Sequence, residues 1–156
     1  RQPLRVLSSD AGHLLWCGIV PSDRAARLVA TLLTPALWSG WGLRTLGAAE
    51  AAYNPVSYHN GSVWPHDTAL FAAGLARYGF QAELACVSRA LFDLAASLPD
   101  MRLPELISGQ AREAGFGPVN YTHACRPQAW AAASIPFMVG LQSAAAASPS
   151  TLRSST

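Results

Sequence analysis

The chain has 156 residues, of which 51% are hydrophobic and only 13% are charged. This length suits one domain of modest size. Because a lone domain carries about a quarter charged residues, we expect much of this chain to be covered, by its own fold or by protein outside it. The net charge is +2 and the eleven basic residues are all scattered arginines, which argues against a nucleic-acid-binding stripe or a polybasic membrane contact.

Membrane and metal-binding patterns are weak in this sequence. No apolar run reaches the ~20 residues that a membrane span needs, and residues 1–10 lack the apolar core of a secretory signal, so we expect a cytoplasmic protein without a membrane partner.

His13 lies four residues before Cys17, and His123 two residues before Cys125, but no CxxC or HExxH motif accompanies them. We therefore predict neither a metal site nor a cofactor.

Hydrophobic periodicity predicts an all-α protein with no strand. The helices are expected at residues 11–20, 21–33, 65–78, 82–98 and 127–142. The first is almost uniformly apolar, as in a buried helix, and the third is expected to stop at Gly79. Pro136 marks the point at which the last helix can kink.

The connections between these helices alternate in length. The first and second helices, and the third and fourth, are joined by short turns, whereas residues 34–64 and 99–126 form long loops. Loops that long are uncommon and are usually functional. The alternation predicts stacked antiparallel helical hairpins whose long loops gather at one rim. Residues 143–156 are small, polar and of low complexity, and we expect this tail to be disordered.

The first long loop leads into the most informative stretch, from Tyr53 to Asp67, which reads YNPVSYHNGSVWPHD. It is too polar for a core strand and too rich in proline and glycine for a helix interior. Aromatic rings can stack on the C–H faces of a sugar, while amide, imidazole and carboxylate groups hydrogen-bond to its hydroxyls. The stretch therefore indicates a carbohydrate site. The alternative is an ordered loop that packs its own rings between helices.

The second long loop carries a single acid, Glu105, directly after Pro104. Proline fixes the local backbone, and a carboxylate held in this way can accept a proton from water. The other interpretation of Glu105 is a surface residue at a turn. Farther along, Gln128 and Trp130 open the last predicted helix, where free backbone N–H groups point outward.

Several stretches of the sequence together resemble the amylo-alpha-1,6-glucosidase and glycogen-debranching group of glycoside hydrolases, and more distantly the enzymes with glucoamylase-like toroids. The stretches follow the order of the family over about residues 6–142, and the longest is the most specific. They are Ser8–Trp16, Ser39–Leu46, Tyr53–Asp67, Arg102–Leu106 and Cys125–Ala131.

This resemblance implies an (α/α)6 toroid, in which an outer ring of helices surrounds an inner ring and a pocket opens at one end. It also implies an inverting hydrolase with Glu105 as its general base. The general acid of the family is an aspartate on an earlier helical hairpin, and Asp67 is implied to be a pocket residue instead. Residues 1–142 are thus expected to be the C-terminal part of a catalytic domain, with the N-terminal part of the same domain as partner.

The substrate that the resemblance implies is an α-glucosidic linkage, α-1,6 in the first place, in a glycogen-like or oligosaccharide substrate. The residues expected to hold the glucosyl unit are Trp41, Tyr58, His59, Trp64, His66 and Asp67, and those expected in the pocket wall are Arg44, Gln128 and Trp130. Departures from the family pattern at residues 10–11, 108–110 and 121–123 leave the choice of sugar open.

Two other hypotheses fit the same residues. One is a non-catalytic carbohydrate-binding protein, or a degenerate remnant that lacks the general acid. The other is a helical scaffold whose two long loops form no common pocket. The toroid hypothesis adds an expectation about the surface, because the inner helices of a partial ring would expose apolar side chains and favour association. The side chains expected there are Leu14, Leu15, Trp16, Phe71 and Trp130.

Overall fold

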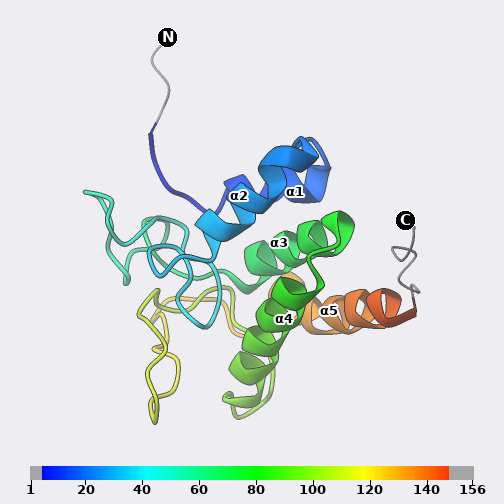
Figure 1. Ribbon diagram of the computed structural model, residues 1–156. Coiled ribbons are helices and arrows are strands. Elements are labelled where there is room, and N and C mark those ends of the chain that lie inside the picture. Colours follow the sequence, from blue (N-terminus) through cyan, green and yellow to red (C-terminus); the bar gives the residue numbers. More distant parts are fainter. Residues whose placement is uncertain (1–4, 148–156) are drawn as a thin grey trace, which may run out of the picture.

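The computed structural model describes residues 5–147, and within this range the fold is all-α, as predicted (Figure 1). Its helices are α1 (Ala11–Cys17), α2 (Ser22–Leu32), α3 (Pro65–Tyr78), α4 (Gln81–Ala96) and α5 (Ala129–Ala147). Residues 5–147 contain isolated β-bridges but no β-strand. The helices therefore lie in the order and positions that the hydrophobic periodicity predicts.

Two helix ends differ from the predicted ones by three residues or more. Helix α1 stops at Cys17 because Gly18 adopts a left-handed conformation, φ 73°, and its N–H bonds back to the last turn. Helix α5 continues through Pro136 as far as Ala147, well into the segment expected to be disordered, since an alanine run is a strong helix former. Residues 148–156 of that expected tail lie outside the described residues.

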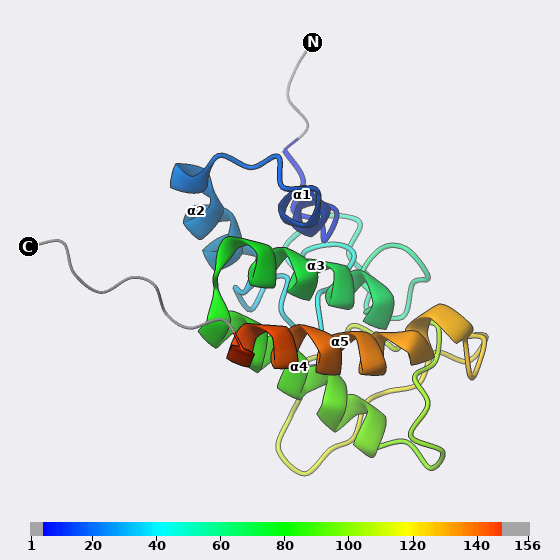
Figure 2. The ribbon, with the colours of Figure 1, turned by 90° about the vertical axis from the view of Figure 1, so that its right-hand side faces the viewer.

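Helix α3 lies between the other helices. It packs against α1 on one side and against α5 and α4 on the other, while α2 packs mainly on α1 (Figure 2). Gly12 allows α1 to approach the ring of Phe71, and Gly74 lies against the backbone of α1 at Leu15. Leu15 and Phe71 are consequently fully buried, which corrects the expectation that both are exposed.

The two long loops meet at one end of the helix layers, opposite the short turns, as Figure 1 shows. An antiparallel bridge joins them: the N–H of Val63 donates to the carbonyl of Ile107 at 3.0 Å, and the N–H of Ile107 donates back at 2.9 Å. Both residues are fully buried. This bridge brings the aromatic stretch of the first loop next to the segment that carries Glu105.

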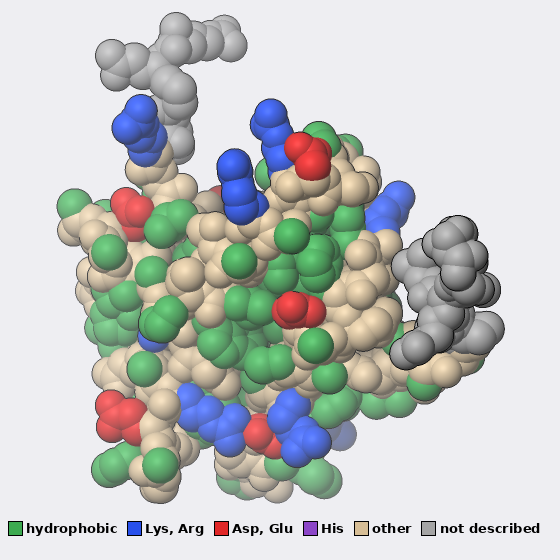
Figure 3. Space-filling view, viewed as in Figure 1, with side chains coloured by type: hydrophobic (Ala, Val, Ile, Leu, Met, Phe, Trp, Pro, Cys, Tyr) green, Lys and Arg blue, Asp and Glu red, His purple; other side chains and the backbone are tan. Residues whose placement is uncertain are grey.

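The surface carries several exposed apolar side chains but no basic patch on the face in view. Figure 3 shows arginines at separate places on that face. Leu14, Trp16 and Trp130 are 43%, 45% and 54% exposed, as expected for them. By length and composition alone, α5 is long and apolar enough to cross a membrane, which the sequence pattern did not predict. One face of this helix, with Ala131, Ser134 and Met138, is buried in the fold.

Candidate active site

Glu105 accepts hydrogen bonds from one residue of each long loop. The hydroxyl of Tyr58 donates to Oε1 of Glu105 at 2.7 Å, and the backbone N–H of Cys125 donates to Oε2 at 3.4 Å. The hydrogen bond to the carboxylate is the main cause that raises the pKa of Tyr58 to about 12, so Tyr58 stays a donor at neutral pH. Glu105 is half-buried, and its carboxylate has a fixed direction.

An aromatic cluster surrounds Tyr58. Its ring packs edge-on against His59, Trp64 and Tyr121, with ring centroids 4.6, 4.9 and 5.8 Å away. The indole N–H of Trp64 donates to the carbonyl of Tyr58 at 3.2 Å and to the hydroxyl of Ser62 at 3.0 Å. These contacts fix the rings relative to Glu105, although the two loops are far apart in sequence.

A pocket of 520 Å³ opens beside this cluster. It is lined by Ser9, Asp10, His13, Thr45, His59, Trp64, His66, Asp67 and Trp130. His59, Trp64, His66, Asp67 and Trp130 are residues predicted to bind sugar. Glu105 and Tyr58 do not line the pocket themselves; Tyr58 connects Glu105 to its wall by packing on His59 and Trp64.

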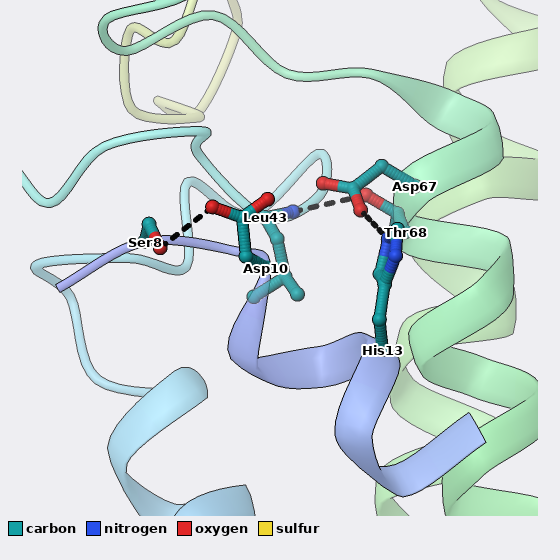
Figure 4. A network of polar contacts seen from close by, with 6 residues as sticks. All are labelled: Ser8, Asp10, His13, Leu43, Asp67 and Thr68. Atoms are coloured by element: carbon teal, nitrogen blue, oxygen red, sulfur yellow. Dashed lines mark hydrogen bonds and ion pairs between the residues drawn. The ribbon is translucent and has the colours of Figure 1, made fainter. Parts of the chain in front are cut away.

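His13 and Asp67 both line the pocket, and they form an ion pair (Figure 4). Nε2 of His13, on α1, lies 2.5 Å from Oδ1 of Asp67, in the first turn of α3. The hydrogen bond to Asp67 is the main cause that raises the pKa of His13. Sequence reasoning did not place His13 in the sugar site, although its position inside the matching stretch 8–16 was an available signal.

His66 joins the lining of the pocket to helix α5. It stacks on Trp130 with ring centroids 3.9 Å apart and planes 17° apart, and burial lowers its pKa. The charges of Asp67 and Glu105 both act on it in the opposite direction, so both carboxylates lie within electrostatic reach of this ring. The stack also fixes Trp130, which is otherwise half-exposed.

Besides Tyr58, three more of the predicted sugar-site residues do not line the pocket. Arg44 is 4% exposed and donates from Nε to the backbone carbonyl of Gly109 at 2.6 Å, so it anchors the second loop. Trp41 is 5% exposed and lies under the guanidinium of Arg112, 4.3 Å from the ring centroid. Gln128 is half-buried just before α5.

Within residues 5–147 no group of three or more His, Cys, Asp or Glu side chains could hold a metal ion. Cys17, Cys86 and Cys125 are free and exposed. The side chains that line the pocket offer carboxylate and imidazole acid–base chemistry together with hydrogen bonding and ring stacking.

Comparison with known proteins gives the family. The family model of the mannosylglycerate hydrolase MGH1-like glycoside hydrolase domain matches residues 1–116. Among solved structures, the chain is similar to a GH63 mannosylglycerate hydrolase from Thermus thermophilus in complex with glucose, with 22% identity and a TM-score of 0.63 over 89% of this chain and 32% of that chain. It is also similar to an uncharacterized conserved protein from the same organism, with 23% identity and a TM-score of 0.61 over 89% of this chain and 33% of that chain. Comparison with curated proteins gave no match.

The chain thus spans about a third of the length of these solved relatives, and its fold is part of an all-α toroid, as predicted. The predicted glycoside hydrolase class is confirmed, while the matching family is named for mannosylglycerate hydrolase and not for amylo-alpha-1,6-glucosidase. The chain belongs to the family of mannosylglycerate hydrolase MGH1-like glycoside hydrolase domains.

Proposed function

We propose that this chain forms part of the catalytic domain of an inverting glycoside hydrolase, with Glu105 as the general base. The observation that carries this proposal is the hydrogen bond from Tyr58 to Glu105, because Tyr58 packs on two rings of a pocket lined by aromatic, imidazole and carboxylate groups. Family membership supports the reaction class.

The base needs a fixed carboxylate next to the water that attacks the sugar. In an inverting glycosidase the water lies between the base and the anomeric carbon, and the acid stands about 6.5–9.5 Å from the base to leave room for it. Tyr58 and the N–H of Cys125 each occupy one oxygen of Glu105, and each oxygen keeps a lone pair with which it can take the proton.

The general acid belongs, in this proposal, to a part of the domain outside this chain. The chain spans about a third of its solved relatives, so two thirds of a toroid of that length have no counterpart in it. An apolar hollow of 490 Å³ between α1, α3 and α5 supports a covering partner. The partner that fits is further helices of the same catalytic domain, packed on the exposed rings of Trp130 and Phe137.

The substrate is, in this proposal, an α-linked hexosyl unit whose C–H face meets the rings of Trp64 and Trp130. Two candidates are an α-1,6-linked glucan, which the sequence pattern indicates, and mannosylglycerate, the substrate in the name of the matching family. The pocket volume of 520 Å³ suits one or two sugar units.

The experiment is hydrolysis of both candidates by the protein expressed from its complete reading frame, with and without Glu105→Gln. We expect Glu105→Gln to lower kcat by about 100- to 10,000-fold without changing the thermal unfolding midpoint. The matched control is Glu113→Gln, since Glu113 is exposed and lies away from the pocket. An unchanged rate in Glu105→Gln would exclude its role as base.

A second candidate function is carbohydrate binding without hydrolysis. It is favoured by the aromatic pocket that this chain builds by itself. Calorimetric titration with glucose and maltooligosaccharides, together with the hydrolysis assay, separates the two functions. If the protein expressed from its complete reading frame binds these sugars but does not hydrolyse the glycosides, the result supports carbohydrate binding as the function.

A further inference from the structure

The hydroxyl of Tyr58 is engaged with the carboxylate of Glu105. It donates to Oε1 at 2.7 Å, the usual length of a strong hydrogen bond from a hydroxyl to a charged oxygen. The contact that Oε2 accepts from the backbone N–H of Cys125 is 3.4 Å long and therefore weaker. A glutamate side chain has three torsions, of which the last is broad, so the hydroxyl of Tyr58 does most to fix the direction of this carboxylate.

The backbone and the ring of Tyr58 are themselves held in place. Its carbonyl accepts hydrogen bonds from the hydroxyl of Ser62 at 2.7 Å and from the indole N–H of Trp64 at 3.2 Å, and both of these residues are buried. From the second loop, the ring of Tyr121 packs on the ring of Tyr58 with centroids 5.8 Å apart. Tyr58 therefore offers its hydroxyl at a fixed point, and the carboxylate of Glu105 is fixed with it.

We propose that Tyr58 is the positioning residue of Glu105, which fixes its carboxylate for the attacking water, and that Tyr58 does not bind the sugar. This inference rests on the function proposed above and deepens it. It assigns a different role to a residue that the family resemblance implies to hold the glucosyl unit. Tyr58 acts on the reaction only through Glu105, so it is a positioning residue and not a catalytic one.

Two observations separate Tyr58 from the residues that line the pocket. Its neighbours His59 and Trp64 line the pocket of 520 Å³, whereas Tyr58 does not. A phenol has one O–H to donate, and the carboxylate of Glu105 takes it. A sugar hydroxyl could receive that proton only if the bond to Glu105 broke, so the role that remains for the hydroxyl of Tyr58 is to hold the base.

The same contacts connect the wall of the pocket to the base. Trp64 lines the pocket, and its ring packs edge-on against the ring of Tyr58 with centroids 4.9 Å apart. The pocket wall and the hydroxyl that holds Glu105 are thus parts of one packed unit. Because a misplacement of about 1 Å can cost about 100-fold in rate, we expect the hydroxyl of Tyr58 to affect kcat and not the binding of the sugar.

The test is hydrolysis of the two candidate glycosides by the protein expressed from its complete reading frame, with and without Tyr58→Phe, which keeps the ring and loses the hydroxyl. We expect kcat to fall about 10- to 100-fold, with KM and the calorimetric affinity for glucose changed by less than about twofold. The matched control is Tyr78→Phe, since the hydroxyl of Tyr78, at the end of α3, donates to the carbonyl of Val20 at 2.7 Å, away from the pocket. This control should lower the thermal unfolding midpoint and leave kcat unchanged.

Two further variants test whether Tyr58 acts through Glu105. Adding Tyr58→Phe to Glu105→Gln should not lower the residual rate further, because the effects of residues that act as a unit are not additive. Ser62→Ala removes a donor to the carbonyl of Tyr58, and Ser62 does not line the pocket. We expect Ser62→Ala to lower kcat less than Tyr58→Phe does, again without a change in KM. Thermal unfolding of each variant checks that the fold is intact.

The outcomes separate this inference from the proposed function. If Tyr58→Phe keeps its kcat while Glu105→Gln loses it, the positioning role is overturned and the role of Glu105 stands. A raised KM or a weaker affinity for glucose at unchanged kcat would make Tyr58 a sugar-binding residue and overturn the inference. An additive loss in the double variant would show that Tyr58 acts independently of Glu105, with the same consequence. A complete protein that hydrolyses neither glycoside would overturn both proposals.

Discussion

Gly109 lies so close to Gly61 that a Cβ atom on Gly109 would overlap the carbonyl oxygen of Gly61. Gly61 lies within the aromatic stretch of the first loop, and Gly109 follows Glu105 in the second. Only a residue without a side chain permits this approach. The two loops that build the candidate site thus approach each other closely at these glycines. The bridge between Val63 and Ile107 joins the same two loops.

Gly109→Ala is therefore expected to separate the loops. Overpacking of this kind costs about 1–3 kcal/mol and sometimes more, and here the neighbour is backbone and cannot rotate away. We expect a lower free energy of unfolding and loss of activity together, measured by urea denaturation and hydrolysis. Gly117→Ala is the control, since a Cβ there meets nothing within 4 Å; equal stability of the two variants would contradict the prediction.

Arg44→Ala is expected to destabilise the protein by about 2–3 kcal/mol. Its guanidinium donates to the carbonyls of Gly109 at 2.6 Å and Pro35 at 2.8 Å, and hydrogen bonds to a charged group contribute about 1.5–3 kcal/mol. Arg89 is exposed, so Arg89→Ala should change the free energy of unfolding by less than about 0.5 kcal/mol. A stable Arg44→Ala variant with weakened sugar binding would instead indicate a role in the pocket.

The tyrosine titration should report the contact between Tyr58 and Glu105. The pKa of Tyr58 is raised to about 12, chiefly by its hydrogen bond to Glu105. In Glu105→Gln the negative charge is gone, and we expect that pKa to fall toward the ordinary value near 10. Ultraviolet absorbance during alkaline titration measures this, with Tyr58→Phe identifying the signal. An unchanged titration curve would show that the two side chains do not meet.

The pair of His13 and Asp67 predicts a pH-dependent contribution to stability. The pKa of His13 is raised in the folded state, so its contribution is fully present below the unfolded value near 6.5 and is lost as the pH rises through the folded value. The charged and titratable groups that act on this histidine are Asp10, Asp67 and His66. His66 has the opposite sign, because its pKa is lowered.

The measurement compares the unaltered protein with His13→Gln, so that the contribution of His66 largely cancels. The difference in free energy of unfolding should be largest near pH 5.5 and should shrink by pH 8.5. A difference that is the same at both values, or larger at the higher one, would contradict the raised pKa of His13.

The exposed apolar side chains of α5 predict association of this chain when it is expressed by itself. Trp130 and Phe137 are 54% and 43% exposed, and both line an apolar hollow. We expect concentration-dependent association in light scattering, reduced by replacing both residues with serine. Val56, 55% exposed on the first loop, is the control for a single apolar side chain away from this face. A monomer at all concentrations would count against a covering partner.

Much of the fold could be predicted because it depends on local chemistry. The apolar spacing of α3 and α4 and the stop at Gly79 are properties of neighbouring residues. The predicted end of α5, at residue 142, was wrong because the low complexity of residues 143–156 indicated disorder. The alanines at the start of that segment instead extend the helix to Ala147. Glu105 and the stretch from Tyr53 to Asp67 stood out because their residue types are unusual together in a loop.

The sequence by itself determined the helices, the two long loops and the residue types that suit a sugar. Only the tertiary structure decided which side chains meet: Tyr58 with Glu105, His13 with Asp67, and Arg44 with the backbone of the second loop. Helix and turn preferences act over a few residues, whereas these contacts join positions 47, 54 and 65 residues apart. Their formation depends on how α1 packs on α3 and how two glycines let the loops approach, and no local pattern encodes that.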